Sequence, residues 1–177
     1  MSIEEIASKS VASQHPKELE QLLRAVSGID INNVLEIGVH HGHSMQVWDW
    51  AFNPEFLTGV DIVDHVEIPE YKEKLIVGDS TALPILDAVM TATRSTPEIP
   101  NIDFLFIDGN HLEDFVRFDW KMYSRLVREG GVIAFHDVWL KDHELVGVYK
   151  VWDTLKLAHN YQEIHFEGGT GVGVIFK

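Results

Sequence analysis

Cysteine is absent from this sequence of 177 residues. A disulfide scaffold, a cysteine-ligated zinc site, an iron–sulfur cluster and a thiol nucleophile are therefore all excluded. No apolar run approaches the roughly 20 residues that a membrane-spanning helix needs. The first residues also lack the basic start and apolar core of a secretory signal. The composition therefore predicts a protein of a reducing compartment, the cytoplasm.

Basic residues are scarce as well. Only 14 Lys and Arg stand against 28 Asp and Glu, which gives a formal net charge of −14. Such a field repels nucleic acid phosphates and anionic lipid headgroups. We therefore expect a small-molecule partner, with no nucleic acid and no membrane, and the sequence leaves a homo-oligomer open. The length predicts a single domain over 1–177, opened by a helical segment over 1–30.

Apolar periodicity predicts strands and helices that alternate along the chain. The stretches with helical spacing are 1–28, 45–52, 84–93, 112–127 and 145–159. The apolar runs expected as strands are 34–39, 56–63, 74–77, 102–107, 132–135, 163–166 and 172–176. The first five runs do not alternate with polar residues, which is typical of a parallel sheet buried on both faces. Only a few residues join the last two, so that pair is expected to be antiparallel.

Each of the first five strands ends in residues that can hold a ligand or a metal. Open α/β sheets bind ligands at the carboxyl ends of their strands. The residues found there are, in strand order, the turn 38–44, Asp61, Asp79, Asp108 followed by His111, and His136 with Asp137. Asp and Gly are common in simple turns, but five such endings in succession favour a binding site.

The turn Gly38–Ser44 has the spacing G-x-x-x-G. It matches neither the G-x-G-x-x-G fingerprint of dinucleotide sites nor a P-loop. Ser44 is expected to cap the following helix, where free N–H groups suit a carboxylate. Asp61 follows Gly42 by 19 residues, a suitable distance for an acid that holds ribose hydroxyls. A nucleoside that carries a carboxylate and no pyrophosphate describes S-adenosylmethionine (SAM).

Five segments resemble those of a known family. They are VLEIGVHHGHSMQVW (34–48), TGVDIV (58–63), VGDST (77–81), DFLFIDGNH (103–111) and GGVIAFHDV (130–138). In order and spacing they are similar to class I SAM-dependent methyltransferases, in the small-molecule O-methyltransferase branch that includes the catechol and caffeoyl-CoA enzymes. Within it, the sequence resembles the cephalosporin-hydroxylase-like and sugar O-methyltransferase group. The resemblance covers about 33–177. It implies a Rossmann-like α/β fold with seven strands in the order 3-2-1-4-5-7-6, strand 7 antiparallel and helices on both faces.

The resemblance also implies a cofactor site. The residues that would line the methionine half of SAM are Glu36, Gly38, His40, Gly42 and Ser44. Asp61 would hold the ribose, while Asp79 and Ser80 would flank the adenine.

Metal-dependent members of the family place an Asp at the end of strand 4 and two adjacent ligands at the end of strand 5. The matching residues here are Asp108, and His136 with Asp137. Carboxylates suit Mg²⁺ or Mn²⁺, whereas an added imidazole shifts the preference towards Mn²⁺, Fe²⁺ or Zn²⁺. His111 stands where many members carry a basic lysine. Its reference pKa of about 6.5 suits a general base near neutral pH.

Three functions compete on this sequence. The first is SAM-dependent methylation of a small-molecule hydroxyl, assisted by a divalent metal, with a metal-independent enzyme as its variant. The second is a non-haem iron oxygenase that uses Asp108, His111 and His136, which leaves the glycine turn and Asp61 unexplained. The third is a SAM-binding protein without turnover, which the short chain favours.

Overall fold

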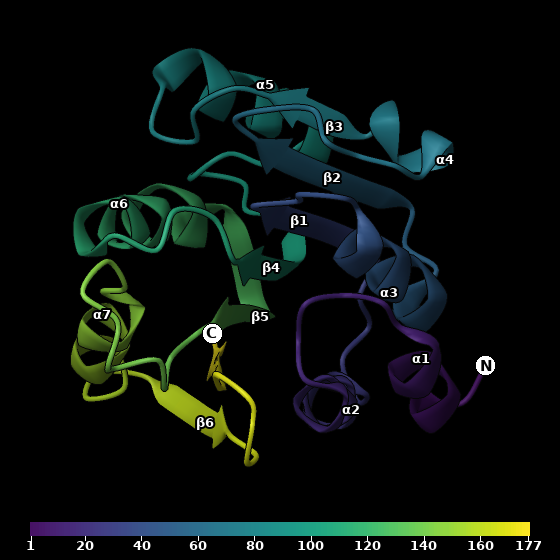
Figure 1. The fold of residues 1–177 in the computed structure, drawn as a ribbon. Helices are drawn as coiled ribbons and strands as arrows, with labels where there is room; N and C mark the ends of the chain where they lie inside the picture. The colour runs from purple at the N-terminus through teal and green to yellow at the C-terminus, as the bar shows by residue number, and fades with distance from the viewer.

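Seven strands form one mixed sheet in the computed structural model, which describes residues 1–177 (Figure 1). The strands are β1 (Asn33–Ile37), β2 (Phe56–Asp61), β3 (Leu75–Val77), β4 (Ile102–Ile107), β5 (Val127–His136), β6 (Asn160–Ile164) and β7 (Val172–Phe176). Their spatial order is β3-β2-β1-β4-β5-β7-β6. The strands from β1 to β5 pair in parallel, and β7 is antiparallel to both of its neighbours. The expected order and the antiparallel final pair are confirmed.

Helices cover both faces of this sheet. They are α1 (Ile3–Lys9), α2 (Pro16–Val26), α3 (His43–Phe52), α4 (Pro69–Lys72), α5 (Leu83–Thr93), α6 (Glu113–Tyr123) and α7 (Val148–Leu155), with a 3₁₀ turn η1 (Ser124–Leu126). One apolar core joins the sheet to α1, α2 and α3, and a second joins it to α5, α6 and α7. Strands β1 and β4 are buried along their whole length. None of the helices is both long enough and apolar enough to cross a membrane.

The fifth strand begins earlier than the sequence indicates. The helix expected over 112–127 ends at Tyr123, and β5 starts at Val127 directly after η1. Gly130 and Gly131, which follow the expected helix in the sequence, lie inside this strand. Gly130 has a φ of +75°, and the pairing of β4 with β5 shifts register between Ile102 and Phe104. The glycines therefore permit a bulge rather than a turn.

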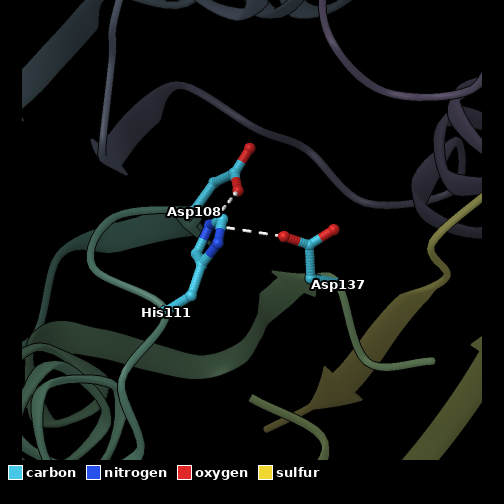
Figure 2. Close-up of side chains that lie close together, drawn as sticks. All are labelled: Asp108, His111 and Asp137. Atoms are coloured by element: carbon cyan, nitrogen blue, oxygen red, sulfur yellow. Dashed lines mark ion pairs between the residues drawn. The ribbon is translucent and has the colours of Figure 1, made fainter. Parts of the chain in front are cut away.

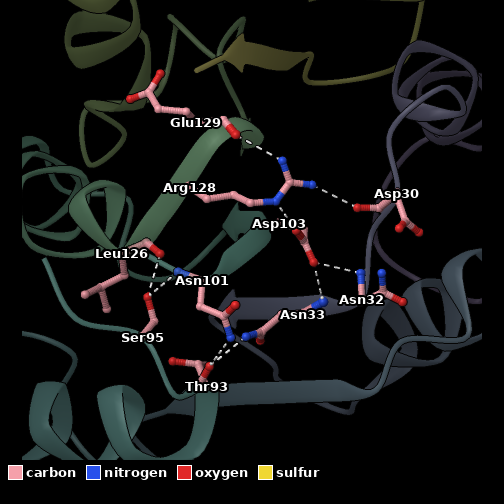
Figure 3. Close-up of polar contacts among 10 residues, drawn as sticks. All are labelled: Asp30, Asn32, Asn33, Thr93, Ser95, Asn101, Asp103, Leu126, Arg128 and Glu129. Atoms are coloured by element: carbon pink, nitrogen blue, oxygen red, sulfur yellow. Dashed lines mark hydrogen bonds and ion pairs between the residues drawn. The ribbon is translucent and has the colours of Figure 1, made fainter. Parts of the chain in front are cut away.

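A polar network fastens the amino ends of the central strands, opposite the edge where their carboxyl ends lie (Figure 3). Asp103 of β4 is almost fully buried, and its Oδ2 accepts the backbone N–H groups of Asn32 (2.8 Å) and Asn33 (2.7 Å). Its other oxygen pairs with Arg128 of β5. The Asn33 side chain also donates to the carbonyl of Thr93, the last residue of α5. These bonds fix β1, β4 and β5 against one another, and so fix the relative positions of their far ends.

Candidate active site

A cavity of about 580 Å³ lies at the carboxyl ends of the parallel strands. Small-molecule sites typically enclose about 300–1,000 Å³. All of the predicted site residues except Glu36 and Gly42 line this cavity. The sheet edge therefore brings together the polar strand endings that the sequence singled out.

The glycine turn after β1 is shaped by close approach of the backbone. Gly38 has a φ of +89°, and a Cβ there would lie 2.2 Å from the carbonyl oxygen of Asp108. No other residue type fits between β1 and β4 at this point. Gly42, also at positive φ, is the N-cap of α3. Ser44 was expected to cap this helix, but it lies inside the first turn and is buried. The cap prediction is wrong because glycine's left-handed conformation, rather than a side-chain hydroxyl, ends the turn.

Asp61 at the end of β2 holds the glycine turn in place. Its Oδ2 accepts the backbone N–H groups of Val39 (2.9 Å) and His40 (2.8 Å). Its Oδ1 accepts a longer bond from the N–H of Val63 (3.3 Å). One oxygen is thus committed to the turn, while the other keeps capacity for a ligand hydroxyl.

Glu36 at the end of β1 is fully buried behind the cavity wall. Its Oε2 accepts the indole N–H of Trp48 (3.2 Å), and its Oε1 has no partner. Burial raises the pKa of Glu36 well above its usual range, against the opposing effect of the Ser44 hydroxyl and the Trp48 indole. Contact between Glu36 and a cofactor stays a prediction.

The turn after β3 rests on helix α6. Asp79 accepts bonds from the N–H and the hydroxyl of Thr81, which lower its pKa. The Tyr123 hydroxyl donates to the carbonyl of Ser80 (2.7 Å). Beside them lies Asp119, a buried residue of α6. It is 1% exposed, and neither of its oxygens makes a hydrogen bond. Burial raises the pKa of Asp119 to about 7, although the nearby Ser80 hydroxyl acts to lower it.

Replacing Asp119 by asparagine should stabilise the fold above neutral pH. The unfolded chain releases this proton near pH 4, whereas the folded protein holds it to about pH 7. Between these values the folded state binds more protons, so wild-type stability falls as the pH rises. Between pH 5.5 and pH 8 the loss should be about 2 kcal/mol. Urea unfolding at both pH values should show this loss in wild type and in the control Asp114→Asn, and not in Asp119→Asn. An unchanged pH dependence in Asp119→Asn would refute the assignment.

Two carboxylates and an imidazole converge between the ends of β4 and β5 (Figure 2). Asp108 directly follows β4, Asp137 directly follows β5, and His111 lies in the loop before α6. The His111 Nε2 is 3.4 Å from Asp108 Oδ1 and 3.3 Å from Asp137 Oδ2. One ligand atom from each residue lies within 4.8 Å of the other two. Two carboxylate oxygens and an imidazole nitrogen form a donor set that suits a divalent cation.

His136 lies beside this group and uses both ring nitrogens. Its Nδ1 is 3.2 Å from Asp108 Oδ1 and 3.4 Å from Asp137 Oδ1, and its Nε2 is 3.1 Å from the Thr170 hydroxyl. The group that could hold a metal contains His111 instead of His136. Ligation by His136 stays a prediction, and it would require the ring to exchange its bond with Asp108 for the metal.

The imidazoles and carboxylates of this group shift one another's pKa. Burial alone would raise the pKa of Asp108, but hydrogen bonds from His111 and His136 outweigh it and lower the pKa. Burial opposes charge on His136 too, yet Asp108 and Asp137 raise its pKa. The Asp108 carboxylate is therefore anionic at neutral pH, as a cation site requires.

The sheet order is that of the class I methyltransferase fold. The family model described as "Methyltransferase domain" matches residues 35–138, which is more than half of the chain. The protein belongs to this family.

Similar proteins include known O-methyltransferases. The mycinamicin VI 2''-O-methyltransferase of Micromonospora griseorubida is 32% identical over 113 residues, which cover 60% of this chain and 27% of that enzyme. The MycE methyltransferase of the mycinamycin pathway was solved with Mg, S-adenosylhomocysteine (SAH) and mycinamycin VI. It superposes with a TM-score of 0.67 at 20% identity, and the match covers 100% of this chain and 53% of MycE. The O-methyltransferase from Bacillus cereus, solved with SAH, superposes with a TM-score of 0.68 at 15% identity. That match covers 99% of this chain and 90% of the Bacillus cereus enzyme. This chain thus spans about a quarter of the first enzyme and about half of MycE.

Proposed function

We propose that the protein transfers a methyl group from SAM to a hydroxyl of a small molecule, with the help of a divalent cation, Mg²⁺ or Mn²⁺. The observation that carries this proposal is the convergence of Asp108, His111 and Asp137 in the cavity that also contains the glycine turn after β1. Membership of the methyltransferase family supports it. The Mg and SAH bound in MycE support it further.

The cavity offers a suitable set of partners for SAM, which would supply a methyl group on a positively charged sulfur. The turn that contains Gly38 and His40 presents backbone to the cavity, and the first turn of α3 lies directly behind it. Asp61 keeps an oxygen with capacity for a ribose hydroxyl. Asp79 and Ser80 line the side of the cavity next to β3, where the adenine is proposed to lie.

At the other side of the cavity the residues present suit activation of a hydroxyl. A cation held there would lower the pKa of an acceptor hydroxyl. Asp108 and Asp137 would bind the cation as anions, and His136 is the candidate for a further ligand. His111, half-buried at the cavity edge, is placed to take the proton that the acceptor loses. Holding the acceptor oxygen against the methyl group supplies much of the rate by positioning alone.

Family membership argues against the iron oxygenase, and a measurement of turnover distinguishes the enzyme from a SAM-binding protein. An iron oxygenase would leave the family match and the turn anchored by Asp61 without a purpose. A SAM-binding protein without turnover would show binding and no product.

We further propose that residues 1–177 act as one domain, because both apolar cores pack on the same sheet. Cytoplasmic location and the lack of a nucleic acid partner stay predictions from composition, and the possibility of a homo-oligomer stays open.

Calorimetric titration with S-adenosylhomocysteine (SAH) tests cofactor binding. We expect wild type to bind SAH, and Asp61→Ala to bind it about 10–100-fold more weakly. This variant loses a charge-assisted hydrogen bond, worth about 1.5–3 kcal/mol, and also the anchor of the glycine turn. Asp64→Ala removes an exposed carboxylate from the same loop and should bind like wild type. If folded wild-type protein gives no binding heat with SAH or SAM, the methyltransferase proposal fails.

A further inference from the structure

The segment between α1 and α2 forms part of the active-site wall. Ala12, Ser13 and Gln14 line the cavity, although they precede the family-matched region 35–138. Gln14 is 4% exposed, and its Nε2 donates to Asp108 Oδ2 at 2.8 Å. A side chain 94 positions away in the sequence thus contacts the carboxylate at the centre of the proposed metal group.

The contact divides the two oxygens of Asp108 between different partners. Gln14 occupies Oδ2, while His136 Nδ1 and His111 Nε2 lie 3.2 and 3.4 Å from Oδ1. Only Oδ1 therefore faces the group that contains His111 and Asp137. The Gln14 bond fixes which oxygen of Asp108 is directed at the cation position.

The other end of the Gln14 amide shows that this contact is more than packing. Its Oε1 is buried and has no hydrogen-bond partner. A buried acceptor without a partner destabilises a fold, and a methionine of similar length would fill the space without that cost. The reverse amide orientation would set Oε1 against the anionic Asp108, so the carboxylate determines the orientation. The feature of Gln14 that this position uses is its N–H donor.

We propose that Gln14 is a positioning residue of the metal centre, which holds Asp108 so that it binds the cation through Oδ1 alone. The inference rests on the proposed function, because it needs a cation at Asp108. Partners that orient a metal-binding carboxylate typically alter metal affinity or activity by about 10–100-fold when they are lost. The segment between α1 and α2 would then be part of the catalytic unit, and not a cover for the sheet alone.

Mn²⁺ titration followed by electron paramagnetic resonance of the free ion tests this inference on the full chain. Gln14→Met keeps the length of the side chain and removes the donor. We expect its Kd for Mn²⁺ to rise about 10-fold or more, its SAH affinity to stay at the wild-type value, and part of its kcat to return at saturating Mn²⁺. Gln14→Asn keeps the amide but is one methylene short, so it should lose Mn²⁺ affinity similarly. Val11→Ala changes an exposed residue of the same segment and should behave as wild type.

Two results overturn the inference, and they are distinguishable. Gln14 variants that bind SAH normally and Mn²⁺ within twofold of wild type would show that the Asp108 contact does not position the carboxylate. Wild-type protein that binds SAH but no Mn²⁺ would instead remove the metal from the proposed function, and this inference with it.

Discussion

Replacing Asp108 by asparagine is expected to reduce methyl transfer by at least about 10³-fold. The variant keeps the shape of the side chain but removes the charge with which Asp108 is proposed to bind the cation, in a group that offers only two carboxylates. A bound divalent ion contributes several kcal/mol to such reactions, and each 1.36 kcal/mol is a factor of ten in rate. Because His111 and His136 keep the wild-type carboxylate anionic, the charge that is lost is a full one at neutral pH.

Turnover of Asp108→Asn should be measured beside its Mn²⁺ and SAH affinities. We expect the loss of rate to be accompanied by loss of Mn²⁺ binding, while SAH binding changes little. Asp114→Asn, which removes an equal charge from the exposed side of α6, serves as the control and should retain activity. An active Asp108→Asn enzyme, or a wild-type enzyme that keeps full activity after exhaustive chelation, would show that no cation is needed.

His111→Gln should lower kcat by about 100-fold or more and leave SAH affinity nearly unchanged, since glutamine cannot accept the proton. Without a cation, the hydrogen bond to Asp108 raises the pKa of His111, against the effect of burial and with help from Asp137. A bound cation acts in the opposite direction and favours the neutral imidazole. The wild-type rate should therefore rise with pH through one ionisation near neutrality, as the imidazole loses its proton.

The pH profile of kcat at saturating Mn²⁺ distinguishes the roles open to His111. In the variant the ionisation near neutrality should disappear, while the exposed control His143→Gln keeps the wild-type profile. Wild-type kcat with an unchanged profile would mean that His111 is not the base. Loss of Mn²⁺ affinity as large as the loss of rate would make His111 a metal ligand, as its place within 4.8 Å of both carboxylates allows.

Much of the fold followed from local patterns. Apolar strand runs and the short connection before β7 predicted a parallel sheet with an antiparallel end, and the family resemblance supplied the strand order. The boundary near Val127 did not follow. Leu126 of η1 continues the helical spacing of α6, and a glycine pair after a helix resembles a helix stop. Whether Gly130 ends a helix or forms a bulge in a strand depends on how β5 pairs with β4. The spacing of apolar residues along the chain carries no information about that pairing.

The site was predictable where backbone alone determines position. The carboxyl ends of parallel strands lie at one edge of the sheet, so Asp61, Asp108 and Asp137 were expected to line the same cavity, as they do. The contacts within the site depend on the direction of each side chain, which the sequence does not give. For this reason the group that could hold a metal contains His111 and not His136. Gln14 reaches Asp108 from 94 residues away, and Asp119 is buried on a helix face beside Ser80. These contacts exist only once the helices are packed on the sheet.

A crystal structure of the protein grown with Mn²⁺ and SAH, with anomalous diffraction recorded for manganese, tests the central claim most directly. We predict an anomalous peak bound by carboxylate oxygens of Asp108 and Asp137, with SAH in the adjoining cavity against the turn 38–44 and its ribose on Asp61. SAH bound elsewhere, or a manganese peak remote from Asp108 and Asp137 in a crystal whose cavity holds SAH, would contradict the account of a metal-assisted methyltransferase.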